Sequence, residues 1–291
     1  MKNEWLLTLR QQLDAASRTC RDLLGATPEP VQEKFPTQFI LTVWRKSLLS
    51  EGWQDMLGPM DVVSFKIADG DKYFQVDEAE ELIGLLPSNV GVHGWGFHYC
   101  LTELQAEKEA ENAATVAQRI GATGYHWNAE KHWAGGSDPS GAAIVFAKRF
   151  KALAPDIDLY ANCFNKSTTS DMMAWFDYFE PMCYGTKPRT ISKKIGARMT
   201  RKDIPPTKRC VMTGTGRMAG AKRAWGYLES SGGHGLVDLV AKYAPHSVNF
   251  FRAGMADGED IMAGPNAVNP ALGEQVKALR QALSDVARES V

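Results

Sequence analysis

The polar residues at 126–130 have the types and spacing that could do chemistry. The run GATGYHWNAE at 121–130 reads as a short strand entered through a turn. Alternate residues of a strand share a face, so His126, Asn128 and Glu130 point to one side. A solvated edge tolerates such a row, whereas a buried strand tolerates it only if the groups are hydrogen-bonded or functional. Glu130, with an amide beside it on the same face, is the candidate general acid/base.

Regular alternation of strand-like and helix-like segments surrounds this run. Apolar and β-branched stretches predict strands at 39–44, 62–68, 90–99, 121–130, 157–164, 178–184, 209–215 and 247–252. Helices are expected after them at 47–57, 77–86, 102–120, 140–154, 170–176, 190–200, 221–243 and 270–287. A helix between successive strands makes the strands parallel. Eight such units in about 250 residues favour an α/β fold of the closed (β/α)8 TIM-barrel type over 36–291.

An open, doubly wound sheet is the alternative to the barrel. It is disfavoured because no Gly-x-Gly-x-x-Gly follows the first expected strand. Residues 1–30 predict an N-terminal helix and linker, since apolar residues recur at helical spacing before the TPEP turn at 27–30. Charged residues interrupt this helix, so it is neither a signal peptide nor a membrane span.

The composition limits the classes of partner and the compartment that we expect. Lys and Arg total 33 against 34 Asp and Glu, and the resulting charge of −1 favours no nucleic-acid partner. The five cysteines are widely spaced and form no Cys-x-x-Cys pair, so free buried thiols in a reducing compartment are expected. We expect a soluble protein that is cytoplasmic when made, without membrane insertion, and that reaches a cell wall only if released or delivered by another system. The oligomeric state stays open.

Barrel enzymes place their chemistry at the carboxyl ends of the strands. Those ends are rich here in carboxylates, amides and aromatic rings, which suit a sugar because pyranose faces stack on rings while hydroxyls take directed hydrogen bonds. Asp69 and Glu180 are the candidates for a second catalytic carboxylate. A separation of about 5 Å from Glu130 would favour retention, and roughly 6.5–9.5 Å inversion. The candidate substrate-binding residues are Trp95, His98, Tyr99, Trp133, Asn162 and Arg252.

The sequence signals for a metal, cofactor or phosphate site are weaker. Four histidines flank the run, at 93, 98, 126 and 132, but no His-x-His or His-Glu-x-x-His is present. We therefore predict no metal and no cofactor, and a metal-dependent barrel hydrolase stays as an alternative. A phosphate site at the TGTG turn, 213–216, rests only on analogy with other barrels. Burial of Glu130 among Trp127, Trp133 or Tyr184 is expected to raise the pKa of its carboxyl group.

Two short motifs resemble a known superfamily. HWNAE at 126–130 resembles the fourth-strand Asp-x-Asp-x-Glu of chitinase-like glycoside hydrolases, and PMCY at 181–184 resembles their sixth-strand Met-x-Tyr. The resemblance implies Glu130 as the general acid/base, Asn128 as the group that orients the substrate's 2-acetamido group, and Tyr184 as its partner. His126 and Asn128 stand where chitinases have aspartates. The endo-β-N-acetylglucosaminidases look closer at this point, because they use Asn-x-Glu.

A second resemblance covers more of the chain. FKIADG at 65–70, WGFHY at 95–99, Asn128-x-Glu130 and EPMCY at 180–184 look like the muramidase family of phage and bacterial lysozymes, which cut peptidoglycan. Their first-strand catalytic aspartate has no counterpart, since Trp44 and Arg45 end the first expected strand. Both resemblances agree on Glu130.

These patterns lead to one functional hypothesis and one rival. The hypothesis is a glycoside hydrolase that cleaves N-acetylhexosamine-containing glycans, of peptidoglycan or chitin-like type, and that has a polysaccharide as its partner. The rival is a non-catalytic carbohydrate-binding or assembly protein on a degraded hydrolase barrel, because the two aspartates are replaced.

Overall fold

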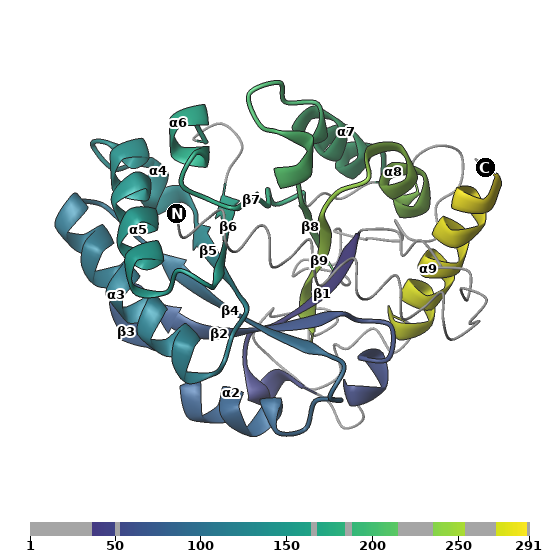
Figure 1. The fold of residues 1–291 in the computed structure, drawn as a ribbon, viewed down its shortest axis with the longest axis horizontal. Helices are drawn as coiled ribbons and strands as arrows, with labels where there is room; N and C mark the ends of the chain where they lie inside the picture. Colours follow the sequence, from purple (N-terminus) through teal and green to yellow (C-terminus); the bar gives the residue numbers. More distant parts are fainter. Residues whose placement is uncertain are drawn as a thin grey trace, which may run out of the picture. The chain divides into compact units, whose positions relative to one another are not determined.

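The computed structural model describes residues 37–49, 53–163, 168–183, 188–214, 235–253 and 272–289. All of them belong to one compact unit, Phe35–Val291, drawn in Figure 1. The predicted N-terminal helix and linker at 1–30 lie outside the described residues. Within the described part of the chain, no helix is both long and apolar enough to cross a membrane.

The strands alternate with helices along the unit. The parallel strands are β1 (Gln38–Val43), β2 (Val62–Asp69), β4 (Gly91–His98), β5 (Gly124–Ala129), β6 (Asp158–Cys163), β7 (Tyr178–Phe179), β8 (Val211–Gly214) and β9 (Ser247–Ala253). The helices are α2 (Val76–Ile83), α3 (Glu103–Arg119), α4 (Lys131–Ala134), α5 (Pro139–Leu153), α6 (Ser170–Met173), α7 (Pro188–Met199), α8 (Leu236–Tyr243) and α9 (Leu272–Glu289). Short 3-10 turns are η1 (Lys46–Leu48), η2 (Trp53–Met56) and η4 (Pro206–Lys208).

The sheet closes on itself. Its ladder runs β7-β6-β5-β4-β2-β1-β9-β8, and each neighbouring pair is parallel. Isolated parallel bridges, Phe179 with Arg209 and Met182 with Met212, join the two ends. The Cys210 N–H also donates to the Phe179 carbonyl at 2.7 Å. The strand order is therefore circular, and the predicted (β/α)8 barrel is confirmed. An antiparallel strand, β3 (Lys72–Tyr73), pairs with β2 and was not predicted.

Local signals explain the two helices that flank β5. The Thr102 hydroxyl caps α3 by accepting from the Gln105 N–H at 3.2 Å, and Asp138 caps α5 by accepting from the Gly141 N–H at 2.9 Å. A proline at the first position of α5 suits the fixed backbone angle there. Small residues form the buried face of α3, which lets this helix pack closely: Ala106, Ala110, Ala113, Ala114 and Ala117. Helices α3 and α5 pack against each other outside β4 and β5 (Figure 1).

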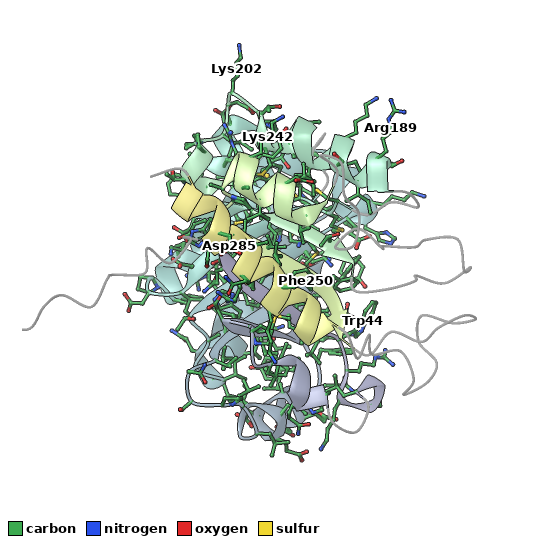
Figure 2. All side chains as sticks on the ribbon, turned by 90° about the vertical axis from the view of Figure 1, so that its right-hand side faces the viewer. Trp44, Arg189, Lys202, Lys242, Phe250 and Asp285 are labelled. Carbon is green, nitrogen blue, oxygen red and sulfur yellow. The ribbon has the colours of Figure 1, made fainter. Side chains whose placement is uncertain are left out.

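Burial separates the core from the charged surface. Figure 2 looks onto α9, behind which Phe250 of β9 is completely buried and stacks on Phe39 at 6.2 Å between ring centroids. Lys202 and Arg189 project away from the barrel in the same view. Four cysteines, 100, 163, 183 and 210, are free and buried, as predicted for core thiols. Cys20 lies outside the described residues.

Strand β5 has the two faces that its sequence predicts. Tyr125 and Trp127 point outward to the helices, with Tyr125 5.2 Å from the Phe150 ring and Trp127 5.8 Å from the Phe146 ring. His126 points inward, where its ring stacks on Tyr160 of β6 at 4.5 Å. The helix that follows directly, α4, was not predicted. It turns the chain immediately after Glu130.

Candidate functional site at the carboxyl end of the barrel

A β-bulge in β2 brings Lys66 and Asp69 to one face of the sheet. Lys66 pairs with Trp95 and Asp69 pairs with Phe97, so three steps along β2 match two along β4 and Ile67 is the extra residue. In a regular strand, residues three apart face opposite sides. Here the Lys66 ammonium instead donates to the Asp69 carboxylate at 2.7 Å. Bulges recur beside active sites, where they re-aim side chains in this way.

Strand register links Asp69 to Asn128 across the sheet through Phe97. Asp69 pairs with Phe97, Phe97 pairs with Asn128, and Asn128 pairs with Asn162, across four neighbouring strands. Glu130 follows β5 two residues beyond Asn128, so it shares the inward face one step closer to the carboxyl end. The structure thus brings Asp69, Asn128 and Glu130 to the end where barrel enzymes carry out their reactions.

The surroundings of Glu130 disfavour the ionised form of its carboxyl group. Its side chain is half-buried, and this burial raises its pKa above the usual range. A hydrogen bond with the Asn128 side chain and the nearby His132 partly offset the rise. The predicted direction of the pKa shift is confirmed, although Trp127 and Trp133 lie behind the strand and do not enclose the carboxyl group.

Tyr99 and His132 lie between the two carboxyl groups. The Tyr99 hydroxyl donates to the second Asp69 oxygen at 3.2 Å, so both oxygens of that carboxylate are hydrogen-bonded. The Tyr99 ring centroid is 5.7 Å from that of His132, which follows Glu130 by two residues. Burial, followed by the Asp69 charge, raises the pKa of Tyr99, so the phenol keeps its proton and donates.

Glu180 lies in the barrel interior rather than at its carboxyl end. It is completely buried, and its Oε2 accepts from three side chains: His126 Nδ1 at 2.7 Å, Asn162 Nδ2 at 2.8 Å and Asn249 Nδ2 at 3.2 Å. The other His126 nitrogen lies 3.0 Å from Nδ1 of His93. Neither side chain is exposed, so this geometry does not support the predictions that Glu180 is a catalytic carboxylate and that Asn162 binds substrate, and both stay untested.

Three predicted substrate-binding rings are also buried. Trp95 donates to the Val43 carbonyl at 3.0 Å inside the barrel. Trp133 packs on Trp127, 5.0 Å between ring centroids, and donates to the Pro139 carbonyl at 2.6 Å. His98 faces outward, since it is three residues from the inward-facing Trp95. All three rings are buried, so this geometry does not support the predictions that they bind a sugar, and the predictions stay untested.

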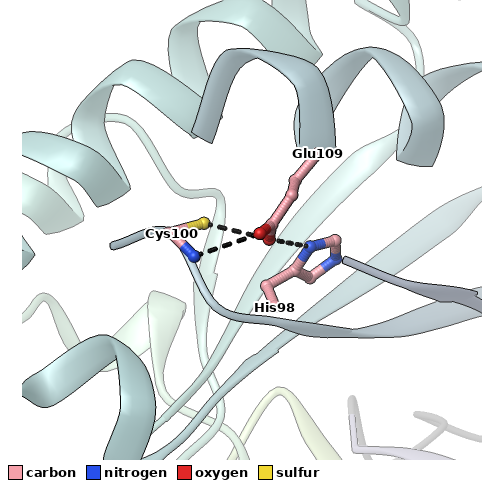
Figure 3. A group of neighbouring side chains, drawn as sticks. All are labelled: His98, Cys100 and Glu109. Atoms are coloured by element: carbon pink, nitrogen blue, oxygen red, sulfur yellow. Dashed lines mark hydrogen bonds and ion pairs between the residues drawn. The ribbon is translucent and has the colours of Figure 1, made fainter. Parts of the chain in front are cut away.

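His98 belongs to a buried cluster with Cys100 and Glu109 behind β4 (Figure 3). The Glu109 carboxylate contacts His98 Nδ1 at 3.0 Å and accepts from the Cys100 N–H at 3.2 Å. Burial alone would raise the pKa of Glu109, but the interactions with His98 and Cys100 hold it below its usual value. Tyr125 contacts the remaining His98 nitrogen at 2.9 Å. These donor atoms are a set that could hold a metal ion, yet each has a hydrogen-bond partner, which supports a structural role in joining β4 to α3.

Two predicted site residues cannot be placed. Tyr184 lies outside the described residues. Arg252 lies in β9, near a register shift between β9 and β1, and its side chain lies outside the described residues. The TGTG turn is described only to Gly214.

Lys66 is a site residue to which the sequence analysis gave no role beyond its place in the FKIADG run at 65–70. Its ammonium lies 4.1 Å from the Phe74 ring centroid, 5.2 Å from that of Trp44 and 5.5 Å from that of Trp95. A small open cavity, lined in part by Trp44, Arg45 and Lys66, lies beside it. The sequence signal was a lone lysine within the otherwise apolar run VVSFKIA at 62–68.

Comparisons with known proteins identify the fold. Neither a protein-family model nor a curated protein sequence matches the chain. Among solved structures, it is similar to a GH18 chitinase from Pseudoalteromonas aurantia, with a TM-score of 0.58 and 11% identity over 84% of this chain and 100% of that one. The chain is also similar to an endo-β-N-acetylglucosaminidase from Cordyceps militaris, with a TM-score of 0.57 and 10% identity over 89% of this chain and 97% of that one. For a GH18 chitinase from Cycas revoluta, in complex with allosamidin, the TM-score is 0.56 and the identity is 10% over 86% of this chain and 100% of that one. At this identity the similarity establishes the barrel fold.

Proposed function

We propose that this protein is a glycoside hydrolase that cleaves N-acetylhexosamine-containing glycans, of chitin-like or peptidoglycan type, with Glu130 as general acid/base. The observation that carries the proposal is the half-buried Glu130 carboxyl group, whose pKa is raised, beside Asn128 and at the barrel end that holds Asp69. Support comes from the HWNAE motif and from the shared fold with chitinases, one of them solved with chito-oligosaccharides.

Glu130 is the proton donor in this proposal. A general acid must hold its proton at the working pH, and burial serves that need by disfavouring the anion. Protonation of the glycosidic oxygen lets the bond to the anomeric carbon break. The carboxylate formed then accepts a proton from the incoming water.

Asn128 holds the substrate's 2-acetamido group. Its side chain is 8% exposed, and its Oδ1 is buried without a hydrogen-bond partner among the described residues. Its interaction with Glu130 occupies the amide nitrogen, which leaves Oδ1 to accept from the acetamido N–H. The acetamido carbonyl oxygen then attacks the anomeric carbon, and hydrolysis of this intermediate gives retention.

Asp69 supplies the second carboxylate. Lys66 and Tyr99 orient its two oxygens, and about a third of its side chain is exposed. An anion at this place stabilises positive charge that develops on the sugar. If Asp69 instead activates water directly, the product is inverted, so the anomer of the first product distinguishes the two routes.

Reducing-end release from chitin oligosaccharides and from soluble peptidoglycan fragments tests the proposal. We expect release by the wild type and a loss of at least about a thousandfold in Glu130→Gln, because the proton donor is removed. Glu103→Gln, an exposed glutamate on α3, is the matched control and should keep full activity. Full activity in a folded Glu130→Gln variant would refute the proposal.

The non-catalytic rival rests on His126 and Asn128, which stand where the chitinases that the motif resembles carry aspartates. The imidazole of His126 is occupied by Glu180 and His93 inside the barrel. Binding of the same oligosaccharides with no release by the wild type, measured by calorimetry and product analysis, would favour this rival.

A further inference from the structure

We infer that Lys66 is a positioning residue that holds the Asp69 carboxylate in one orientation at the carboxyl end of the barrel. The inference rests on the proposed function, in which Asp69 acts during hydrolysis. It assigns a role to a residue that the proposed function leaves without one.

The backbone of β2 is shaped to make this contact. Without the extra residue Ile67, Lys66 and Asp69 would face opposite sides of the sheet. A bulge weakens the ladder locally, so its presence needs a compensating interaction. The Lys66–Asp69 contact at 2.7 Å provides it, with the lysine side chain only 5% exposed and the aspartate 34%.

Aromatic rings keep the Lys66 ammonium in place. Phe74 and Trp44 are on the segments that follow β3 and β1, while Trp95 is on β4, so three parts of the chain enclose the cation. Cation–π attraction strengthens where the cation is withdrawn from water. The enclosure also limits rotamer freedom, so the ammonium reaches Asp69 from a fixed direction.

The charges around Lys66 make Asp69 its essential partner. Burial lowers the pKa of Lys66, the hydrogen bond and charge of Asp69 raise it again, and the Arg45 cation lowers it. Glu78 of α2 lines the adjoining cavity, and the neutral Tyr99 hydroxyl contacts Asp69 from the other side. The hydrogen bond and charge of Asp69 therefore offset part of the effect of burial on the pKa of Lys66.

Replacement of Lys66 by methionine separates charge from shape. Methionine fills a similar volume against the rings, so Lys66→Met should fold. Without the cation, the Asp69 carboxylate loses the charge-assisted hydrogen bond that fixes its orientation. We expect kcat to fall by about tenfold to a hundredfold with little change in KM.

Two controls accompany this variant. Lys66→Arg keeps a cation in the enclosure and should restore kcat toward its wild-type value. Lys72→Met removes an exposed lysine from β3 and should leave kcat unchanged. A purely structural role for Lys66 would lower thermal stability in Lys66→Met and leave the kcat of the folded enzyme unchanged.

Crystal structures of the wild type and of Lys66→Met test the inference without turnover. A different orientation of the Asp69 side chain in Lys66→Met is the expected result. An unchanged orientation would overturn the inference even if Glu130→Gln abolishes hydrolysis. Conversely, a changed orientation in a protein that shows no hydrolysis would refute the proposed function and leave the Lys66–Asp69 relationship standing.

Discussion

The imidazole of His126 lies 2.7 Å from the carboxylate of Glu180, and both side chains are buried inside the barrel. A carboxylate can only accept, so the His126 nitrogen in this contact donates. Resemblance to the chitinases places an acidic residue at position 126, on the fourth barrel strand. In this protein the interior carboxylate instead comes from residue 180, after β7, and the fourth strand contributes its hydrogen-bonding partner.

Truncation of Glu180 should be strongly destabilising. Glu180→Ala leaves His126 and the amides of Asn162 and Asn249 without their shared acceptor in a site closed to water. We expect a loss of about 3–5 kcal/mol in the free energy of unfolding, measured by urea denaturation. Glu103→Ala, on the exposed face of α3, should change it by less than about 0.5 kcal/mol. Equal effects of the two substitutions would show that the interior network contributes nothing to stability.

Glu130→Gln should stabilise the protein at neutral pH. Because burial raises the folded-state pKa of Glu130 above 4.5, its ionisation opposes folding. The wild-type free energy of unfolding therefore falls as the pH rises from about 4.5 through the raised folded pKa, and the contribution levels off above it. The glutamine variant should gain stability relative to the wild type across that interval and show no gain below pH 4 in denaturant titrations. A lower stability of the variant at pH 7 would contradict this account.

Acid should destabilise the fold through His93. Burial, followed by the charges of His126 and His246, holds the pKa of His93 well below 6.5 in the folded state. The unfolded chain therefore takes up this proton first, and stability is lost as the pH falls below about 6.5 toward the folded-state pKa. His93→Asn cannot be protonated and should show a shallower loss between pH 6.5 and 5 in thermal melts. His132→Asn, at an exposed position, is the control and should keep the wild-type slope.

Trp133 should contribute to stability and not to sugar affinity. It is completely buried between β5 and α5, so Trp133→Ala opens a large cavity. We expect a loss of about 3–5 kcal/mol by urea denaturation, and a smaller loss in Trp133→Phe. Oligosaccharide affinity of the folded phenylalanine variant should equal that of the wild type by calorimetry. A selective loss of affinity at unchanged stability would place this ring in the binding site after all.

The barrel was predictable because local signals repeat. Each strand is a short apolar run and each helix follows with its own cap or spacing, so element order depends on near neighbours in the chain. The faces of β5 were predictable for the same reason, since alternation places His126 and Trp127 on opposite sides. Closure through Phe179 and Arg209 was inferred from the strand count alone.

Side-chain accessibility at the strand ends was predicted less well. Trp133 and His98 were taken for substrate-binding residues because they stand near strand ends. His98 and Trp95 are three residues apart on one strand, so their side chains face opposite sides of the sheet, and the sequence spacing already indicates this. For Trp133 no such signal exists, because α4 turns this residue behind β5 and nothing local marks the turn.

The sequence by itself determined the order of the strands and helices, the inward face of β5 and the choice of Glu130, because these depend on periodicity and on a short motif. Only the tertiary structure decided which polar groups meet. One extra residue in β2 carries Asp69 to the side of Lys66, and hydrogen bonds from three strands hold Glu180 in the interior. Such contacts join residues far apart in the chain, and their geometry exists only once the sheet has closed.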